Sequence, residues 1–317
     1  MGKVAFVFPG QASQYPGMGK ELAEKYPAAR AVFDEADKAL GFSIAKICFE
    51  GSEEELKLTA NTQPAILTVS VAAYRVLAEK GISPDYVAGH SLGEYSALVA
   101  VGSLNFADAV KLVRKRGTYM QDAVPSGQGA MAAIMGLSPA VVVDACKRAA
   151  QGELCAPANL NSPEQTVISG HAGAVKRAVE IASQLGAKRS MVLAVSAPFH
   201  SELMMPAQLK LESDLKATAF GGLQVPLVTN VDADTIRTGD EARSALVRQV
   251  SMPVRWEESM RMLLDEGVNT IVEVGPGRVL TGLMRQIERS VASLNVEDEK
   301  SLSATLEKIA GAKSDAA

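Results

Sequence analysis

The turn that decides this fold reads Gly89-His90-Ser91-Leu92-Gly93-Glu94. A short apolar segment at 86–88 precedes it, and a helix-like apolar segment at 95–101 follows it. A serine on a sharp turn between a strand and a helix is the pattern of the nucleophile elbow, G-x-S-x-G. The N–H groups at the start of such a helix point toward any oxyanion that forms beside the serine hydroxyl. The flanking segments favour this interpretation over an ordinary glycine-rich loop, so we predict that Ser91 is a nucleophile.

Strand-like and helix-like segments alternate on both sides of this turn. A strand is predicted at 4–8, and helices are predicted near 19–39, at 62–80 and at 105–122. The run Asn61-Thr62-Gln63-Pro64 is typical of a helix start, and we expect the second helix to begin there. Alternation of this kind favours an α/β fold with a parallel sheet covered by helices.

A break at Pro125-Ser126-Gly127-Gln128-Gly129 interrupts this alternation. The segments predicted after it are strand 130–135, helix 139–150, strand 154–160, strand 165–169, helix 172–185 and strand 190–195. The order β-α-β-β-α-β is that of a ferredoxin-like unit. We therefore predict a discontinuous main domain of residues 1–126 and 197–317 with a mainly parallel sheet, interrupted by a ferredoxin-like subdomain at 127–196.

The chain is expected to re-enter the main domain through Ser196-Ala197-Pro198. The segments predicted there are helices near 200–217, 240–250 and 256–266, strand 270–274 and a helix that ends near 288. The tail beyond residue 295 is small and polar, and we expect its last residues to fray.

Composition excludes several classes of protein. The 317 residues are 47% hydrophobic, enough for a buried core, and 32 basic against 36 acidic residues leave a net charge of −4. The sequence has no basic block with interleaved aromatic residues, so we do not expect it to bind nucleic acid. No apolar run reaches membrane-spanning length. Cys48, Cys146 and Cys155 lack metal-ligand spacing and are interpreted as reduced core residues. The first residues carry no export signal, so we expect a cytoplasmic protein without a metal or a membrane anchor.

A serine nucleophile needs a base to take its proton, and the chain offers three histidines. His90 is adjacent to Ser91, and neighbouring side chains on an elbow point in different directions, so we expect His90 to pack under the turn. His171 lies at a predicted strand-to-helix junction, where a surface or capping role is the safer interpretation. His200 lies where the chain re-enters the main domain, and it is the best candidate for the general base.

An α/β-hydrolase with the order serine, carboxylate, histidine is the simplest alternative. The carboxylates available between Ser91 and His200 include Asp108, Asp122, Asp144 and Glu164. None of these four occupies the end of a predicted core strand. The sequence therefore favours a dyad whose histidine is oriented by something other than a carboxylate.

Five motifs occur in order along the chain, and together they are far more specific than any one of them. They are Phe8-Pro9-Gly10-Gln11-Ala12-Ser13-Gln14, Gly89-His90-Ser91-Leu92-Gly93-Glu94-Tyr95-Ser96-Ala97-Leu98, Val113-Arg114-Lys115-Arg116-Gly117, Gly129-Ala130-Met131-Ala132-Ala133-Ile134 and Glu273-Val274-Gly275-Pro276-Gly277. With these motifs the chain closely resembles the bacterial malonyl-CoA:acyl carrier protein transacylases of type II fatty acid synthesis and the related acyltransferase domains of polyketide synthases. The resemblance covers the chain to about residue 290. It implies a hydrolase-like core with a ferredoxin-like subdomain, which agrees with the order of strands and helices.

The resemblance also implies the composition of the catalytic dyad. Ser91 would be the acylated nucleophile, and His200 would be its general base. The backbone carbonyl of Gln249 would orient the imidazole ring, which answers the missing-carboxylate problem.

Three further residues would bind the substrate if the resemblance holds. Arg116 would hold the malonyl carboxylate, a task that suits the planar, permanently charged fork of arginine. Gln11 and Leu92 would each donate a backbone N–H to the oxyanion. The adjacent cations Arg114 and Lys115 fit a solvated helix face.

The implied reaction is a ping-pong transfer of malonyl from malonyl-CoA to the phosphopantetheine thiol of acyl carrier protein, with no cofactor. We expect a monomer. Three alternatives remain at this stage: a polyketide synthase acyltransferase, a serine thioesterase or carboxylesterase with water as acceptor, and a non-catalytic module that binds carrier protein. A buried Arg116 opposes the esterase because it would reject neutral acyl groups. The presence of Ser91, His200 and Gln11 together argues against the non-catalytic module, because these are the residues that catalysis would use.

Two finer expectations concern selectivity and docking. Phe199 precedes the expected base, and in related acyltransferases an aromatic residue there accompanies a preference for malonyl over methylmalonyl groups. Carrier proteins are acidic, so cations beside the cleft between the two domains would receive them. The candidates for this docking surface are Lys188, Arg189, Arg278 and Arg285.

Overall fold

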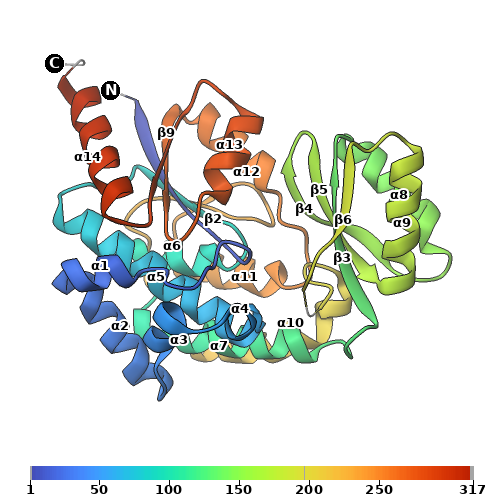
Figure 1. The fold of residues 1–317 in the computed structure, drawn as a ribbon, viewed down its shortest axis with the longest axis horizontal. Helices are drawn as coiled ribbons and strands as arrows, with labels where there is room; N and C mark the ends of the chain where they lie inside the picture. Colours follow the sequence, from blue (N-terminus) through green and yellow to red (C-terminus); the bar gives the residue numbers. More distant parts are fainter. Residues whose placement is uncertain (1, 196, 315–317) are drawn as a thin grey trace.

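The computed structural model describes residues 2–195 and 197–314. Its larger sheet has the strand order β10-β9-β1-β2-β7-β8 (Figure 1). The strands are β1 (Lys3–Phe8), β2 (Tyr86–Gly89), β7 (Leu227–Val228), β8 (Thr235–Ile236), β9 (Val268–Val274) and β10 (Ala292–Val296). Neighbours run parallel except β7 and β8, which pair antiparallel. The mainly parallel sheet predicted from the alternating pattern is therefore confirmed.

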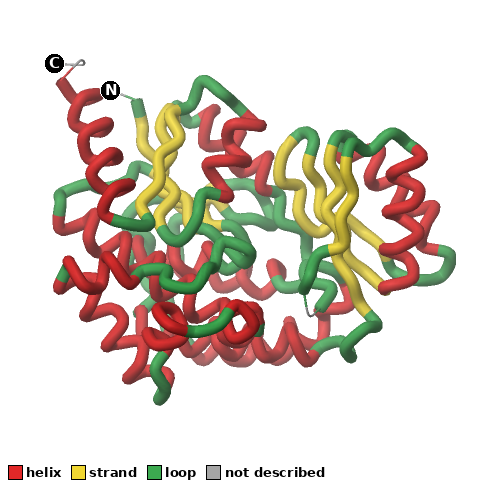
Figure 2. Tube along the Cα trace, in the orientation of Figure 1, coloured by secondary structure: helices red, strands yellow, loops and turns green. Residues whose placement is uncertain are grey.

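Helices bury both faces of this sheet (Figure 2). The larger core includes residues of α1 (Lys20–Lys25), α2 (Pro27–Leu40), α3 (Ile44–Glu50), α4 (Glu53–Lys57), α5 (Thr59–Glu79), α6 (Gly93–Ala100), α7 (Phe106–Asp122), η1 (Glu202–Met204), α10 (Met205–Ala217), α11 (Gly239–Gln249) and α14 (Glu299–Ser314). The smaller core includes residues of α12 (Trp256–Asp265) and α13 (Val279–Ile287). Within the described ranges, no helix combines the length and the apolar character needed to cross a membrane.

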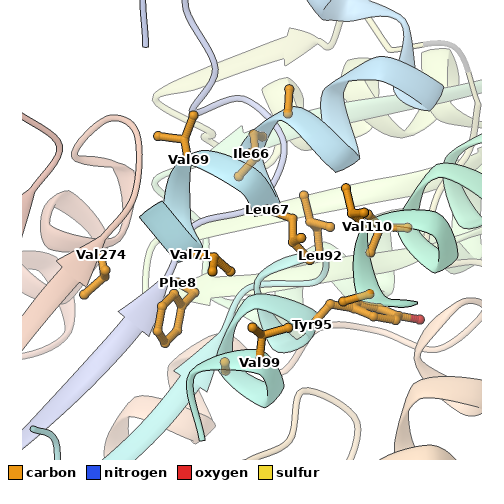
Figure 3. Close-up of a cluster of buried hydrophobic side chains, with 14 of the residues drawn as sticks. Phe8, Ile66, Leu67, Val69, Val71, Leu92, Tyr95, Val99, Val110 and Val274 are labelled. Atoms are coloured by element: carbon orange, nitrogen blue, oxygen red, sulfur yellow. The ribbon is translucent and has the colours of Figure 1, made fainter. Parts of the chain in front are cut away.

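Strand β1 shows why the sequence folds this way. Successive side chains of a strand point to opposite faces, and here Phe6 and Phe8 enter the larger core while Ala5 and Val7 enter the smaller one. Figure 3 shows Phe8 beside Val71 of α5 in the larger core. Because both faces are covered, the strand is a continuous apolar run rather than an alternating one.

The second sheet lies at one end of the molecule and is antiparallel throughout (Figure 1). Its strands β3 (Gly129–Met135), β4 (Cys155–Ser162), β5 (Gln165–His171) and β6 (Arg189–Val192) have the order β4-β5-β3-β6. Helices α8 (Pro139–Ala150) and α9 (Ala172–Gln184) share one core with this sheet. This is the ferredoxin-like arrangement predicted from the order of elements, and that part of the fold class is confirmed.

A short backbone bridge ties the second sheet to the rest of the molecule. Val254, just before α12, donates its N–H to the carbonyl of Ala158 at 2.8 Å and accepts the N–H of Leu160 at 2.9 Å. Ser162 also donates its hydroxyl to the Gln286 side chain on α13 at 2.9 Å. The two sheets are therefore held at a fixed separation, which matters because the candidate active site uses residues of both.

Two predicted helices have different bounds in the structure. The segment predicted as one helix near 19–39 is two helices, which meet at Tyr26 in an extended conformation because the residue before Pro27 avoids the helical region. The helix predicted at 62–80 begins at Thr59, so the run from Asn61 to Pro64 lies inside α5, and the prediction of a helix start there was wrong. The carbonyl of Leu58 accepts the backbone N–H of Thr62, which continues the turn before the proline.

The tail is more ordered than the sequence indicates. Strand β10 pairs with β9, and α14 follows with Leu302 and Thr305 buried, two elements that were not predicted from the sequence. The side chain of Asp298 accepts the N–H of Ser301 at 2.8 Å, which caps the start of α14. From the sequence this region was described only as small and polar, and a helix start there was not considered. The expected fraying at 315–317 and the domain boundary at residue 196 lie outside the described residues, and the domain bounds stay a prediction.

Other elements were not predicted or were predicted too long. The elements α3, α4, β7 and β8 are all short, and the helix- or strand-like periodicity on which the predictions rest needs longer segments to show. Strand β6 ends at Val192, three residues before the predicted end. Residues 193–195 instead line the pocket described below.

Candidate active site

Ser91 lies on a tight turn between β2 and α6. Its φ angle is 51°, a left-handed conformation that costs a non-glycine residue about 1–3 kcal/mol. Gly89 and Gly93 are required around it: a Cβ on Gly89 would lie 1.9 Å from the carbonyl carbon of Gly93, and one on Gly93 would lie 2.0 Å from the Phe8 oxygen. The turn at Ser91 therefore has the backbone geometry that a nucleophile elbow requires.

His200 contacts Ser91, although the strands of the second sheet lie between the two residues in the sequence. Its Nε2 lies 2.7 Å from Ser91 Oγ, and its Nδ1 lies 2.9 Å from the carbonyl oxygen of Gln249 and 3.2 Å from that of Met252. A carbonyl only accepts, so Nδ1 carries the proton and Nε2 is left free to accept one from the serine. His200 also has a positive φ, 55°, so both members of the pair are held in strained backbone conformations.

The other two histidines do not contact the serine hydroxyl. His90 Nε2 lies 2.9 Å from Asn161 Oδ1, and its ring packs against Trp256 with ring centroids 5.4 Å apart. His171 stands at the start of α9 and accepts the N–H of Leu154 at 2.9 Å. The interpretation of both as structural residues agrees with this geometry.

Burial governs the electrostatics of His200. Burial first, and the positive charge of Arg116 second, lower the pKa of His200 to about 3. Because the pKa in the folded chain lies below the ordinary value of 6.5, falling pH protonates the unfolded chain first and removes stability across that interval. At neutral pH the imidazole is therefore unprotonated and able to act as a base.

We expect the rate constant for acylation of Ser91 to stay level from pH 8 down to about pH 5, because His200 remains neutral throughout that range. Rapid-quench measurements with malonyl-CoA at a series of pH values would test this. A decline with a midpoint near the ordinary histidine pKa would contradict it.

Arg116 is buried on α7 and its guanidinium group reaches the serine. Nη2 donates to Ser91 Oγ at 3.0 Å and to Gln249 Oε1 at 2.9 Å, and Nη1 donates to Gln63 Oε1 at 2.8 Å. The guanidinium carbon lies 5.6 Å from the ring centroid of Tyr95, and Nε has no hydrogen-bond partner in the described part of the chain. A cation is thus held beside the nucleophile by neutral groups.

The neighbouring cations point elsewhere. Arg114 donates to the side chain of Asn61, and Lys115 forms an ion pair with Asp214 at 2.5 Å with its side chain half exposed. Arg116 is the member of this cluster that turns inward.

A pocket of about 400 Å³ opens over the serine, between the two sheets. The residues that line it are Gln11, Ala12, Gln14, Lys57, Thr59, His90, Ser91, Met120, Met131, Asn159, Leu193, Ala194, Val195, Phe199 and His200. Polar and apolar residues both line it, and apolar atoms form most of its exposed surface. Among the described residues, no group of histidine, cysteine or acidic side chains is arranged to hold a metal ion.

The two expected oxyanion donors lie where they could act. Gln11 lines the pocket, and Leu92 directly follows Ser91 with its side chain buried in the larger core (Figure 3). The N–H groups of Gly93 and Glu94 are bonded to the carbonyls of His90 and Ser91. The N–H groups of Gln11 and Leu92 have no hydrogen-bond partner among the described residues, so they remain able to donate.

Sequence reasoning missed several buried polar residues around this site. Gln63 lies in the run that was interpreted as a helix start, and Glu94 lies in the elbow motif itself without a role having been assigned. Burial raises the pKa of Glu94 to about 8. An amide or a carboxyl group within an apolar helical segment is the signal that could have identified both residues, since such groups are buried only with hydrogen-bond partners.

Residues 5–308 match the family model described as the acyl transferase domain. This chain belongs to the acyl transferase family. It is 50% identical over 303 residues to the malonyl CoA-acyl carrier protein transacylase of Bacillus subtilis strain 168, covering 95% of this chain and 96% of that protein. It is 48% identical to the protein of the same name from Escherichia coli K12, covering 97% of this chain and all of that one.

A solved structure of a complex is similar as well. It is a malonyl-transacylase in complex with its type II polyketide synthase acyl-carrier protein, with a TM-score of 0.94 and 46% identity over 96% of this chain and 99% of that chain. In this acyl transferase, Ser91 Oγ joins the histidine and the buried arginine, because it lies within hydrogen-bond distance of both side chains.

Proposed function

We propose that this acyl transferase moves the malonyl group from malonyl-CoA to the phosphopantetheine thiol of acyl carrier protein through a malonyl ester of Ser91. The observation that carries the proposal is the guanidinium group of Arg116, buried and 3.0 Å from the nucleophilic oxygen. A buried cation beside the acylated atom selects an acyl group that carries its own negative charge. The names of the similar proteins agree with this substrate and acceptor.

The first half-reaction forms the ester. His200 Nε2 takes the hydroxyl proton of Ser91 as Oγ attacks the thioester carbonyl of malonyl-CoA. The oxygen of the tetrahedral intermediate receives hydrogen bonds from the N–H groups of Gln11 and Leu92. The carbon–sulfur bond then breaks, and the leaving thiolate of CoA takes the proton from His200.

The second half-reaction repeats these steps with a different thiol. His200 takes the proton of the phosphopantetheine thiol, whose sulfur attacks the malonyl ester. The carbon–oxygen bond to Ser91 breaks, and Oγ recovers its proton from His200. The carbonyl of Gln249 keeps the imidazole in the same orientation and tautomer in both directions.

To bind the malonyl carboxylate, Arg116 must have a hydrogen-bond donor available for it. Two of its hydrogen bonds go to the buried side-chain amides of Gln63 and Gln249, and the third goes to Ser91 Oγ. The contact with Oγ weakens once that oxygen is part of an ester, so this donor passes to the carboxylate as the ester forms. Arg116 thereby binds the acyl group in its reacted position.

The acceptor of this transfer is the carrier protein of fatty acid synthesis in our proposal. A polyketide carrier protein is the second candidate, because the solved complex with 46% identity contains one. Malonylation rates measured with both kinds of carrier protein at equal concentration distinguish the two.

The experiment that tests the proposal is an intact-mass measurement. Mixing the protein with malonyl-CoA should add one malonyl mass, and subsequent addition of carrier protein bearing phosphopantetheine should remove it and malonylate the carrier. Loss of the adduct into free malonate instead of the carrier would indicate a thioesterase and would contradict the proposal.

Phe199 lines the pocket next to His200, where an added methyl group on the α-carbon would be crowded. We expect Phe199→Ser to raise the methylmalonyl-to-malonyl rate ratio by about tenfold, since a methyl-sized difference is worth about 1–3 kcal/mol. Phe199→Leu, which keeps most of the bulk, is the control. An unchanged ratio in a stably folded Phe199→Ser protein would assign Phe199 to packing alone.

The four cations expected to form a docking surface differ in whether they are paired with an acidic side chain. Lys188 is paired with Glu164 at 2.8 Å and Arg278 with Glu297 at 3.1 Å, whereas Arg285 is exposed and has no ion pair among the described residues. Arg189 Nη2 lies 3.6 Å from the sulfur of Met191. An unpaired cation is the most available to an acidic partner.

We therefore expect Arg285→Glu to raise the KM for carrier protein more than Lys188→Glu does, and to weaken the salt dependence of that step. Acylation by malonyl-CoA should stay close to normal. Lys25→Glu on α1, at the end of the molecule away from the second sheet (Figure 1), is the control for net charge. Equal slowing of both half-reactions would show that Arg285 does not act in docking.

A further inference from the structure

Side chains from outside the elbow hold the backbone of Ser91 on both sides. The N–H of Ser91 donates to Oδ1 of Asn230 at 2.7 Å, and the carbonyl of Ser91 accepts from Nε2 of Gln249 at 2.9 Å. Asn230 also donates its Nδ2 to the carbonyl of Gly89 at 2.7 Å. One amide side chain thus bonds two backbone groups of the turn that carries the nucleophile, whose own φ is positive.

The carboxyl group of Glu94 joins these two amides. Its Oε1 accepts the backbone N–H of Asn230 at 2.5 Å, and its Oε2 accepts from Nε2 of Gln249. Glu94 is 1% exposed, and Asn230 and Gln249 are fully buried. The three residues come from α6, from the loop after β7 and from the end of α11.

This arrangement has a consequence for the oxyanion. Because Asn230 takes the N–H of Ser91, that group cannot stabilise the tetrahedral intermediate, and the next N–H in the chain, that of Leu92, is the one left to do so. Asn230 therefore does not touch the reacting atoms. What it can control is the direction in which the strained turn projects Oγ.

We propose that Asn230, tied to the side chain of Gln249 through Glu94, is a positioning residue that holds Ser91 in its left-handed conformation and places Oγ between His200 and Arg116. A strained residue persists only where its surroundings over-determine its conformation, and here both peptide groups of the residue are fixed by buried side chains. The inference rests on the proposed function only in taking Ser91 as the nucleophile.

The test measures the reactivity of Ser91 and the binding of substrate separately. Asn230→Ala should lower the rate of malonylation by malonyl-CoA and the rate of labelling by a serine-directed fluorophosphonate by a similar factor, about ten- to a hundredfold, as expected for a displaced nucleophile. In a Ser91→Ala background, Asn230→Ala should change the Kd for malonyl-CoA by no more than about twofold, as for independent sites. Arg116 and the pocket are untouched in both.

Asn105→Ala is the matched control, because Asn105 is also an asparagine that bonds backbone N–H groups, at the start of α7, but does not contact the elbow. It should lower the melting temperature without changing either labelling rate. Labelling of Asn230→Ala at the wild-type rate would overturn the inference. So would a weakened Kd that matches the loss of rate, since that result indicates a general structural role.

Glu94→Gln provides a second variant that keeps the size and shape of the side chain. The new amide nitrogen replaces one of the two oxygens of Glu94 that accept hydrogen bonds, and it would face an N–H donor. One of the two bonds to Asn230 and Gln249 is therefore lost. Both labelling rates should fall together, by less than in Asn230→Ala. If Asn230→Ala does not fold, unchanged rates in Glu94→Gln overturn the inference. A wild-type protein that malonyl-CoA does not label would instead reject the proposed function.

Discussion

Ser91→Ala should acquire no malonyl mass from malonyl-CoA under conditions in which the wild-type protein is fully modified. The proposed ester has its oxygen in this side chain, so its removal leaves no acceptor for the acyl group. The effect is therefore all-or-none in the mass spectrum, and it is the largest that we expect. The fold should survive, because the bonds that fix the turn go to the backbone of Ser91 rather than to its hydroxyl.

His200→Ala is the companion variant for this measurement. It keeps the nucleophile but lacks the base, so its ester should form about a hundredfold or more slowly. An adduct of the same mass in Ser91→Ala would show that another residue is acylated. A normal rate in His200→Ala at neutral pH would remove the histidine from the mechanism.

Arg116→Ala should lose most of its malonyl transfer and become a relatively better acetyl transferase. The substitution leaves the malonyl carboxylate without a partner in a buried site, and truncation of one side of such a pair costs about 2–5 kcal/mol. Acetyl-CoA has no carboxylate and loses much less. The ratio of malonyl to acetyl acylation rates, measured by rapid quench with each thioester, should fall by a large factor.

Arg116→Lys distinguishes charge from geometry in the same assay. A lysine keeps the positive charge, but its compact ammonium group lacks the planar fork by which Arg116 reaches Gln63 and Gln249 with separate nitrogens. We expect it to be impaired, though less than the alanine variant. Equal loss of malonyl and acetyl transfer in Arg116→Ala would assign the arginine to structure, because it also bonds two buried amides.

The sequence was sufficient for the fold class, and its motifs contain several of the residues that the structure brings together around Ser91. Long segments with a clear period, such as α7 and α8, were predicted to within a residue or two. The elbow was readable because its two glycines, Gly89 and Gly93, stand where a Cβ would clash with neighbouring backbone. His200 could be selected because the chain has few histidines and the other two had better structural explanations.

The remaining features depend on contacts between distant parts of the chain. Gln249 and Ser91 are bonded although 158 positions separate them, and no local pattern encodes that meeting. Asn230 follows a strand of two residues, too short to be recognised by period. Strand β10 was not predicted for a related reason: it is a half-buried edge strand whose partner β9 supplies much of what makes it a strand.

The position of the second sheet in the chain separates the making of the nucleophile from the making of its base. Ser91 and Arg116 are synthesised before that sheet, and His200, 109 residues after the serine, is synthesised behind it. At about 5–20 residues per second, a ribosome needs several seconds to travel this distance. Throughout that interval the nascent chain carries Ser91 without His200, the imidazole that lies 2.7 Å from its hydroxyl in the folded protein. Translation that stops before residue 200 therefore releases a polypeptide that lacks the proposed base.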